Sequence, residues 1–314
     1  MVRYRKYVHV VVFLIIVGLS YQAFPAPYTF LDEQTVVPVS QYNESLYEEI
    51  EQKSGEYNEE PEDAVVDRVW KKTPGRNGIK VNIEKSYHKM KEEGLFNEKL
   101  LVFDQVTPEV SLEDLPPSPI YRGHPEKKMV SFLINVSWGE EHIPDILNTL
   151  KESNLKATFF IEGKWAKNNS ELVKMIDEQG HIIGNHAYNH PDMSRLSEEA
   201  IREQITQTNE ILQAITDQKP RWFAPPSGSY NDRVVQVAHQ LDMETILWTV
   251  DTVDWKNPSV SVMINRVHDK IHPGATILMH PTQAIANGLP ELIERIKAEG
   301  YKVGHVDQLI SEER

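Results

Sequence analysis

The feature that most constrains the fold is a regular alternation of apolar and amphipathic segments after Lys128. Helical stretches such as 197–216, 231–241 and 289–298 separate short apolar runs that are typical of buried strands. These runs are 129–136, 156–161, 181–183, 220–224, 244–250, 275–279 and 301–305. Because helices between consecutive strands require a mostly parallel sheet, the pattern predicts an α/β fold. The seven strands favour a closed or nearly closed (β/α) barrel over an open doubly wound sheet. No glycine-rich phosphate loop follows any of them, which argues against nucleotide binding.

The first residues have the pattern of an export signal. Arg3, Arg5 and Lys6 precede the apolar run Val10–Leu19, as the basic region of a secretory signal precedes its apolar core. The run is shorter than the ~20 residues that an ordinary spanning helix needs. We therefore expect residues 1–27 to be a signal peptide or a membrane anchor. The chain is then exported and acts outside the cytoplasm, secreted or anchored on the cell-wall side of the membrane.

Between this segment and the predicted barrel the composition changes several times. Residues 28–64 are rich in acidic residues, and Ser45 with Glu48 forms a capping box for a short helix over 45–54, although a linker fits equally well. Mixed strand and helix patterns follow, and then a stretch with three closely spaced prolines. We expect a small α/β domain of unknown role at 65–112, a proline-rich linker at 113–127 and the barrel at 128–314.

Composition excludes several classes of function. The chain has no cysteine, so disulfides, thiol nucleophiles, zinc fingers and iron–sulfur clusters are excluded. Its formal net charge of −14 argues against a nucleic-acid partner, since phosphate binding needs clustered lysine and arginine. We expect membrane contact only through the N-terminal segment. The sequence does not indicate an oligomeric state.

Chemistry in such barrels lies at the carboxyl ends of the strands, and histidines gather there. His186 and His190 follow the third predicted strand, and two imidazoles four residues apart can bind a divalent metal from a single turn. The zinc-protease helix motif is excluded, because Ala187 stands where that motif has glutamate. Alone, such a histidine pair is more often structural than metal-binding.

Further polar residues follow the later strands. His280 ends the sixth predicted strand and fits either a general acid or a hydrogen-bonded core histidine. Asp251 and Asp254 flank a short turn, where they fit either a catalytic role or turn and capping chemistry. Pro225-Pro226 shape the wall of a loop under any function.

In order and spacing these segments resemble the five motifs of the polysaccharide deacetylase family (NodB-homology, carbohydrate esterase family 4). The resemblance covers residues 128–312, and the segment 135–139 is most similar to a branch from spore-forming Gram-positive bacteria. It implies a deformed (β/α)7–8 barrel that removes acetyl groups from N-acetylated polysaccharides such as peptidoglycan or chitin-like polymers, with zinc or cobalt. It also implies two metal ligands, a general acid, an orienting aspartate and substrate contacts. These are, in the same order, His186 and His190; His280; Asp251; and Trp138, Pro225, Pro226, Asp254 and Trp255.

The chain departs from the family at three of its motif positions. The resemblance puts Asn135 at the position of the catalytic base, Val136 at that of the aspartate metal ligand and Ala224 at that of the orienting arginine. An amide cannot accept the proton of an attacking water, and a positioned general base typically contributes ~10²–10⁴-fold. Valine offers a metal no donor, so two protein ligands remain where three are the norm in catalytic sites. We expect metal binding to be weak or absent and hydrolysis of the acetamido C–N bond to be impaired.

Three functions remain open. The first is a deacetylase with a rearranged site that recruits a carboxylate from Glu140, Glu141 or Asp192. The second is a glycan-binding protein that does not turn over its ligand. The third is a scaffold for spore or cell-wall assembly. The three missing groups favour the second function, while His280 and Asp251 favour the first.

Overall fold

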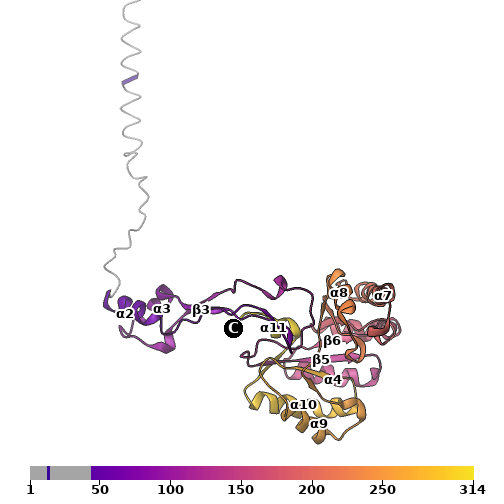
Figure 1. Ribbon diagram of the computed structural model, residues 1–314. Coiled ribbons are helices and arrows are strands. Elements are labelled where there is room, and N and C mark those ends of the chain that lie inside the picture. The colour runs from indigo at the N-terminus through magenta and orange to yellow at the C-terminus, as the bar shows by residue number, and fades with distance from the viewer. Residues whose placement is uncertain (1–12, 15–43) are drawn as a thin grey trace, which may run out of the picture. The chain divides into compact units, whose positions relative to one another are not determined.

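The computed structural model describes residues 13–14 and 44–314 (Figure 1). The predicted export segment lies outside these residues except for Phe13 and Leu14, which are exposed. Within the described ranges, no helix has both the length and the apolar character needed to cross a membrane. The chain divides into two compact units, which are treated separately below. The first combines the described part of Met1–Glu56 with Val81–Val102, and the second combines Tyr57–Lys80 with Phe103–Arg314.

The first unit is a small helical body. It contains α2 (Glu44–Ser54), α3 (Ile83–Met90) and the 3-10 turn η2 (Glu98–Leu100). Asn82 caps α3, because its side chain accepts a hydrogen bond of 2.8 Å from the Lys85 backbone N–H. The apolar faces of the two helices supply a core of four buried residues. These are Leu46, Ile50, Tyr87 and Met90.

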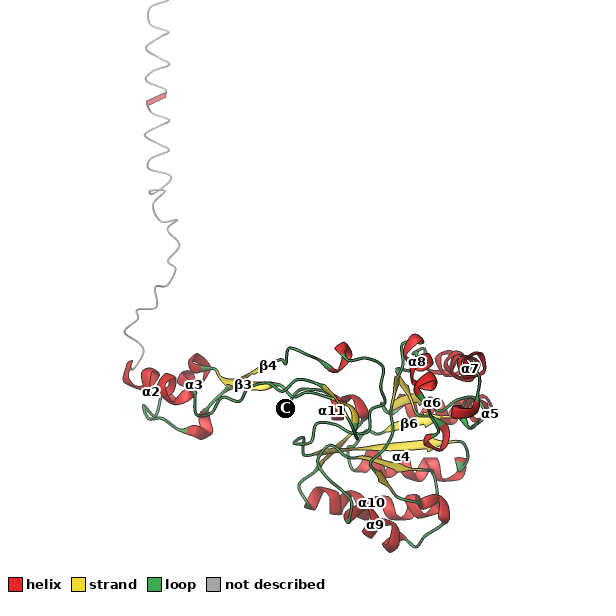
Figure 2. Cartoon of the chain, in the orientation of Figure 1, coloured by secondary structure: helices red, strands yellow, loops and turns green. Residues whose placement is uncertain are grey.

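The second unit is built on a parallel sheet with β5 (Met129–Val136) at its centre (Figure 2). The order is β10-β11-β5-β6-β7-β8-β9, and β12 pairs with the first half of β5. The other strands are β6 (Thr158–Ile161), β7 (Ile182–Asn185), β8 (Trp222–Phe223), β9 (Glu244–Thr245), β10 (Val250–Asp251), β11 (Thr276–Met279) and β12 (Lys302–Gly304). Every pair within this sheet is parallel. The predicted α/β fold with a deformed (β/α) barrel is confirmed.

Helices cover one face of the sheet, and a second core fills its inner face. The helices are α4 (Ile143–Glu152), α5 (Gly163–Asn168), α6 (Ser170–Glu178), α7 (Glu198–Thr216), α8 (Asp232–Gln240), α9 (Val260–His268) and α10 (Gln283–Ala298), while α11 (Val306–Ile310) contributes to the inner core. Val136, Phe159 and Ile161 pack toward α4, α9 and α10. Leu133 and Phe160 point to the inner face. This alternation decides which side chains reach the interior of the barrel.

The barrel has a seam between β9 and β10, where the predicted strand 244–250 is wrong as one continuous element. It is two short strands at opposite edges of the sheet. At the seam, Ile120 takes the place of a strand: its N–H donates to the Thr245 carbonyl and its carbonyl accepts from the Leu247 N–H, both at 2.8 Å. Farther along, Arg122 forms a bridge with Ala275.

Residues that precede the barrel in the chain form two small two-stranded sheets, of which the first is antiparallel. These are β1 (Val65–Asp67) with β2 (Lys71–Thr73), and β3 (Gly78–Val81) with β4 (Phe103–Val106). Pro119 accepts a hydrogen bond from the Lys72 N–H, and fully buried Ile120 joins the inner core, so the proline-rich segment packs within the second unit. The domain boundaries expected from the sequence stay a prediction.

The seam yields a stability prediction. Replacing Ile120 by alanine removes a fully buried side chain from the core behind the seam, and we expect the free energy of unfolding to fall by about 2–5 kcal/mol. Chemical denaturation of the two proteins measures the difference. Val69→Ala, at a side chain that is 65% exposed, is the matched control and should change it by less than about 0.5 kcal/mol. Equal, small effects of both substitutions would show that Ile120 does not hold the seam.

Candidate functional site

The parallel ladder continues one residue past the ends of the strands and builds a layer at the carboxyl rim of the barrel. The N–H of Glu162 donates to the Val136 carbonyl at 2.9 Å, and that of His186 to the Ile161 carbonyl at 3.1 Å. Strand register therefore places Ser137 beside Glu162 and Glu162 beside His186. Side chains two residues apart on a strand point to the same face. Ser137, Glu162 and His186 each lie two positions after an inward-facing residue, so they also point inward.

His186 is locked in one tautomer. Its side chain is fully buried, and Nδ1 lies 2.7 Å from the carbonyl oxygen of Ala224. A carbonyl can only accept, so Nδ1 carries the proton and Nε2 keeps its lone pair. The pKa of His186 is lowered to about 3, mainly by burial, with a smaller contribution from the charges of His190 and His280. The imidazole is neutral at physiological pH and presents the unprotonated Nε2 to the interior of the barrel.

His190 lies against His186 on the loop after β7. The two ring centroids are 5.2 Å apart and the rings are inclined by 68°. Ala187 and His190 both have left-handed backbone angles, with φ of 60° and 57°, which costs non-glycine residues about 1–3 kcal/mol each. Burial lowers the pKa of His190, and the charge of His280 adds to this effect. The loop thus holds two neutral imidazoles together at the expense of backbone strain.

His280 is held by Asp254. Its backbone N–H donates to Asp254 Oδ2 at 2.9 Å, and its Nδ1 lies 3.0 Å from Oδ1. The hydroxyls of Thr252 and Thr282 donate to the same carboxylate, whose residue is fully buried. Burial alone would raise the pKa of Asp254, but the hydrogen bond and charge of His280 outweigh it, so the pKa is lowered. Asp254 is ionised, and His280 Nδ1 is the donor.

The orienting partner of His280 is therefore Asp254, which the sequence analysis had assigned to substrate binding. Asp251, which the resemblance gives as the aspartate that orients the base, is half-buried, and its Oδ1 accepts from the Val253 N–H at 2.8 Å. That bond closes the turn that leads into η7 (Asp254–Lys256). Among the described residues, no hydrogen bond joins Asp251 to His280.

The structure also separates the two predicted carboxylate positions from the histidines. Val136 lies on the helix side of β5, fully buried among apolar side chains, because it alternates with inward-facing neighbours. Asn135 points inward but one layer below the rim, beside Phe160, and its Oδ1 is buried with no hydrogen-bond partner among the described residues. Neither side chain lies in the layer of His186.

The next two residues occupy the rim instead. Ser137 lies in the layer of His186, and Trp138 stacks on His280 with centroids 6.0 Å apart and planes 8° apart. Gly139 follows with φ of 83°, and a Cβ there would meet the Pro281 carbonyl oxygen at 2.0 Å, so only glycine fits this approach. The tight turn presents Trp138, which is 45% exposed.

The remaining predicted contacts lie on loops beside this rim. Pro225 and Pro226 are buried at the start of η6 (Pro226–Gly228), and buried Ala224 is reduced to a backbone acceptor for His186. Trp255 is 49% exposed, with Lys256 Nζ 4.7 Å from its ring centroid.

The three carboxylates considered as substitutes have other partners. Glu140 accepts from Trp165 Nε1 at 3.4 Å, and Glu141 lies 3.6 Å from His142. Asp192 binds Ser194, Ser229 and Arg195.

Glu162 was missed by the sequence analysis. It is 9% exposed, and burial raises its pKa, while the Ser137 hydroxyl and the charge of Lys164 act in the opposite direction. It directly follows an apolar run, so the rule that chemistry follows strand ends could have found it.

The residues present do not fit a catalytic metal centre. His186 has the hydrogen-bonded second nitrogen that metal-binding histidines require, and His190 lies beside it. Among the residues that the structure describes, however, no three histidine, aspartate or glutamate side chains have an arrangement that could hold a metal ion. Two imidazoles are one ligand short of the catalytic norm.

The Asp254–His280 pair yields a pH prediction. The pKa of Asp254 is lowered on folding, so its stabilisation is present above the unfolded-state pKa of about 3.9 and is lost as pH falls through the folded value. We expect Asp254→Asn to lower the free energy of unfolding by about 1.5–3 kcal/mol at neutral pH, the range for hydrogen bonds to a charged group. Denaturation across pH should show that the difference in the free energy of unfolding between the two proteins disappears below about pH 4. A gap that is unchanged in acid would contradict this assignment.

Comparison with known proteins places these features in a family. The model of a family described as polysaccharide deacetylase matches residues 122–246. The uncharacterized protein YlxY of Bacillus subtilis (strain 168) is 49% identical over 316 residues, which cover 99% of each chain. A peptidoglycan-N-acetylglucosamine deacetylase of Bacillus cereus is 37% identical over 167 residues, or 52% of this chain and 61% of that protein.

A solved structure extends the likeness to most of the chain. BA3943 of Bacillus anthracis, a pseudoenzyme of carbohydrate esterase family 4, superposes with a TM-score of 0.82 at 51% identity, covering 86% of this chain and 96% of its own. A mutant of BA3943 with restored enzymatic activity gives the same TM-score. From the identity over the whole chain and the shared fold, the chain belongs to the polysaccharide deacetylase family, carbohydrate esterase family 4.

Proposed function

We propose that this chain binds N-acetylated cell-wall glycan at the histidine rim and hydrolyses the acetamido C–N bond weakly or not at all. The observation that carries the proposal is the pair His186 and His190 without a third ligand, next to a tryptophan stacked on the general-acid histidine. The pseudoenzyme BA3943 supports it as a relative at 51% identity. The named substrate of the Bacillus cereus relative supports peptidoglycan as the glycan.

We infer that Ser137 and Trp138, rather than Asn135 and Val136, stand where active relatives carry their two carboxylates. Ser137 shares the layer of His186, as a general base beside the histidines must. Trp138 reaches His280 and fills the position from which a third ligand would act. A hydroxyl is no base at neutral pH, and an indole offers no lone pair to a metal. Both departures therefore remove catalytic groups and leave the neighbouring histidines in place.

The surviving residues suit binding. Asp254 orients His280, whose remaining ring nitrogen is free to meet a polar group of the sugar. Trp138 and Trp255 are exposed over about half of their surface, and flat aromatic faces are suited to the apolar faces of pyranose rings. Ala224 stands where the family has an arginine that orients the base. Because the chain has no carboxylate at the base position, such an arginine would have nothing to orient.

The wider setting is also part of the proposal. The basic and apolar N-terminal segment supports export and either cleavage or anchoring, so the glycan is met on the outer side of the membrane. Any zinc or cobalt would be held by His186 and His190 alone and therefore weakly. The likeness to proteins of spore-forming bacteria is consistent with a role in spore or cell-wall assembly.

Residual hydrolysis is the second candidate function, and Glu162 is the observation that favours it. Its carboxylate lies in the rim layer between Ser137 and His186, and burial raises its pKa toward the range of a general base. The Asp254–His280 pair needed to protonate a leaving amine is also retained.

Glycan binding and turnover are separated by one pair of measurements. We expect the full chain to bind N-acetylated chito-oligosaccharide or peptidoglycan fragments in calorimetry while releasing no acetate. Trp138→Ala should weaken binding about 10-fold, or about 1.4 kcal/mol, while Trp70→Ala, at another exposed tryptophan, should leave it unchanged. Acetate release that disappears in Glu162→Gln would favour residual hydrolysis. A chain that binds none of these glycans would contradict the proposed binding function.

Restoring the two carboxylates tests their positions. In the double variant Ser137→Asp with Trp138→Asp, we expect one zinc per chain by elemental analysis, because a carboxylate completes the ligand set with His186 and His190. The wild-type chain and the matched control Ser137→Asn with Trp138→Asn should hold far less. If Asn135→Asp with Val136→Asp captured zinc instead, the assignment of Ser137 and Trp138 would be refuted.

A further inference from the structure

The layer at the carboxyl rim is lined mainly by hydrogen-bond acceptors. His186 Nε2 keeps its lone pair, because Nδ1 donates to the Ala224 carbonyl at 2.7 Å. Strand register places Glu162 beside His186, at the roughly 4.8 Å spacing of neighbouring strands. One layer below, Asn135 Oδ1 is buried with no hydrogen-bond partner among the described residues, and the Ser137 hydroxyl above it can donate as well as accept. Three acceptors therefore face the interior at neighbouring positions.

The carboxylate of Glu162 has no bound counter-charge. The residue is 9% exposed and takes part in no ion pair within the part of the chain that the structure describes. The charge of Lys164, two residues later, acts on it from an exposed side chain. A carboxylate that loses hydration without gaining a bound cation is destabilised. A cation that reached Glu162 would therefore be stabilised there.

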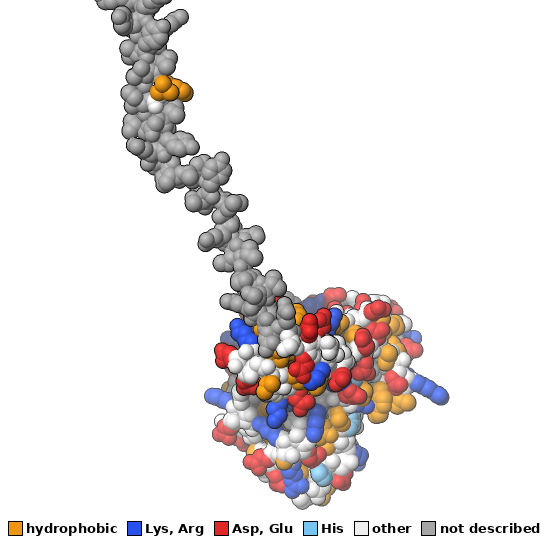
Figure 3. All heavy atoms as spheres, turned by 90° about the vertical axis from the view of Figure 1, so that its left-hand side faces the viewer, with side chains coloured by type: hydrophobic (Ala, Val, Ile, Leu, Met, Phe, Trp, Pro, Cys, Tyr) orange, Lys and Arg blue, Asp and Glu red, His pale blue; other side chains and the backbone are white. Residues whose placement is uncertain are grey.

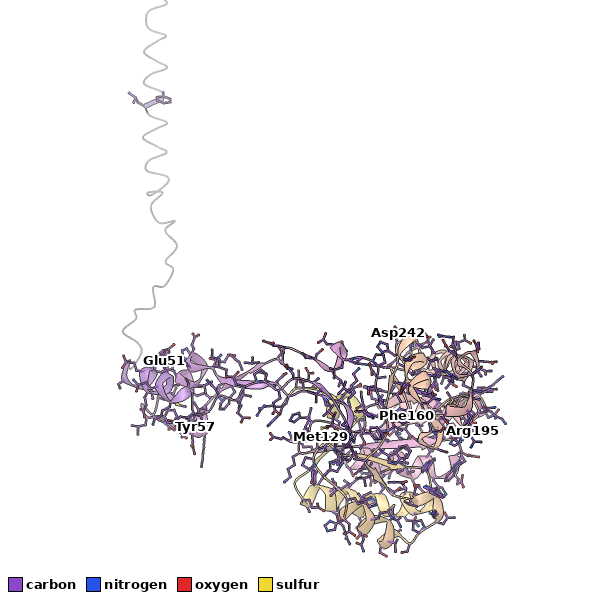
Figure 4. All side chains as sticks on the ribbon, viewed as in Figure 1. Glu51, Tyr57, Met129, Phe160, Arg195 and Asp242 are labelled. Atoms are coloured by element: carbon purple, nitrogen blue, oxygen red, sulfur yellow. The ribbon has the colours of Figure 1, made fainter. Side chains whose placement is uncertain are left out.

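The loops of the rim carry more acidic than basic side chains. In Figure 4 this end of the sheet is marked by Arg195, on the loop after β7, and the opposite end by Met129, at the start of β5. The segments 137–142, 162–164, 186–195, 224–231, 251–257 and 280–282 follow the strands at this end and hold six carboxylates and three lysine or arginine side chains. They are Glu140, Glu141, Glu162, Asp192, Asp251 and Asp254, against Lys164, Arg195 and Lys256.

This excess of negative charge does not depend on the histidines of the rim. His186 and His190 are neutral at physiological pH, and protonation of His142 and His280 would reduce the excess without reversing it. On the face that Figure 3 presents, acidic and basic side chains are interspersed instead. A surface of one sign raises the local concentration of ligands of the opposite sign. The rim therefore favours a cationic ligand group.

An ammonium group fits this lining better than an acetamido group does. An ammonium has three N–H donors and no acceptor, so it can donate to the Glu162 carboxylate and to His186 Nε2 at once. An acetamido group has one N–H donor, and its carbonyl oxygen would face the lone pairs of the same acceptors. A buried acceptor that is left unpaired costs about 1–3 kcal/mol.

We propose that the rim binds the free ammonium of a de-N-acetylated amino sugar between Glu162 and His186, within a glycan whose other sugars keep their acetyl groups. The inference rests on the proposed glycan function and specifies which sugar lies at the histidines. Trp138 and Trp255 are exposed over about half of their surface, and their flat faces suit pyranose rings. A peptide ammonium has the same charge but no such ring, so the tryptophans favour the sugar.

Calorimetry of the full chain with a glucosamine tetramer, an N-acetylglucosamine tetramer and tetralysine tests the proposal. We expect the glucosamine tetramer to bind about 10-fold more tightly than the N-acetylated one, or about 1.4 kcal/mol, and more tightly than tetralysine. Glu162→Gln removes the charge and keeps the size of the side chain, so it should reduce the ratio of the two sugar affinities to about one. Glu210→Gln, at an exposed glutamate on α7, is the matched control and should keep the ratio.

Each outcome bears on a different step of the inference. Equal or tighter binding of the N-acetylated tetramer to the unchanged chain overturns the amino-sugar proposal and leaves the glycan function standing, whether or not the Glu162 variant folds. Tetralysine that binds as tightly as the glucosamine tetramer, or a ratio that Glu210→Gln lowers as much as Glu162→Gln, reduces the effect to general charge attraction and also overturns it. Binding of neither sugar contradicts the glycan function itself.

Discussion

The arrangement of the site depends on the hydrogen-bonded ladder that joins β5, β6, β7 and β8 in parallel register. Residues at equal height on neighbouring strands point the same way, so the ladder alone brings Ser137, Glu162, His186 and Ala224 into one inward-facing layer. A shift of one residue along any strand would exchange the inner side chain for one that faces the helices. Register therefore determines which substitutions affect chemistry. A valine on the helix side contributes packing, and a serine one position later faces the histidines.

The site lacks a general base but keeps Asp254, His280 and His186, and the hydrogen bonds of the retained groups explain this difference. Asp254 receives hydrogen bonds from His280 and two threonines, so removing it would leave a half-buried histidine and two hydroxyls without this acceptor. That network contributes to the folded state whether or not the protein turns over substrate. A general base has no comparable structural role. His186 has both a structural and a site role, since its hydrogen bond to Ala224 satisfies a buried carbonyl and also orients the ring.

Much of the fold followed from the sequence, because strand and helix periodicity is local. The helices predicted at 197–216 and 231–241 match α7 and α8, while α10 begins at Gln283, earlier than the predicted 289. Pro290 lies inside α10, where a proline usually marks a first turn, and this conceals the preceding turns. The split of 244–250 into β9 and β10 depends on where the barrel seam falls. That position is set by Ile120, more than a hundred residues away, and no local pattern reports it.

At the site, the sequence identified which residue types converge but not which atoms meet. The histidines, Trp138 and the aspartates were found because they follow strands, and the structure brings His280 to both Asp254 and Trp138. The bond between Asp254 and His280 could not be predicted, because only two residues of turn separate Asp254 from Asp251 and the geometry of that turn decides which of them reaches His280. The proposed change of the carboxylate positions from Asn135 and Val136 to Ser137 and Trp138 rests on the same kind of non-local information. The polar residues Ser131 and Asn135 of β5 mark its inner face, but the sequence does not show which inward position of β5 lies level with His186 on β7.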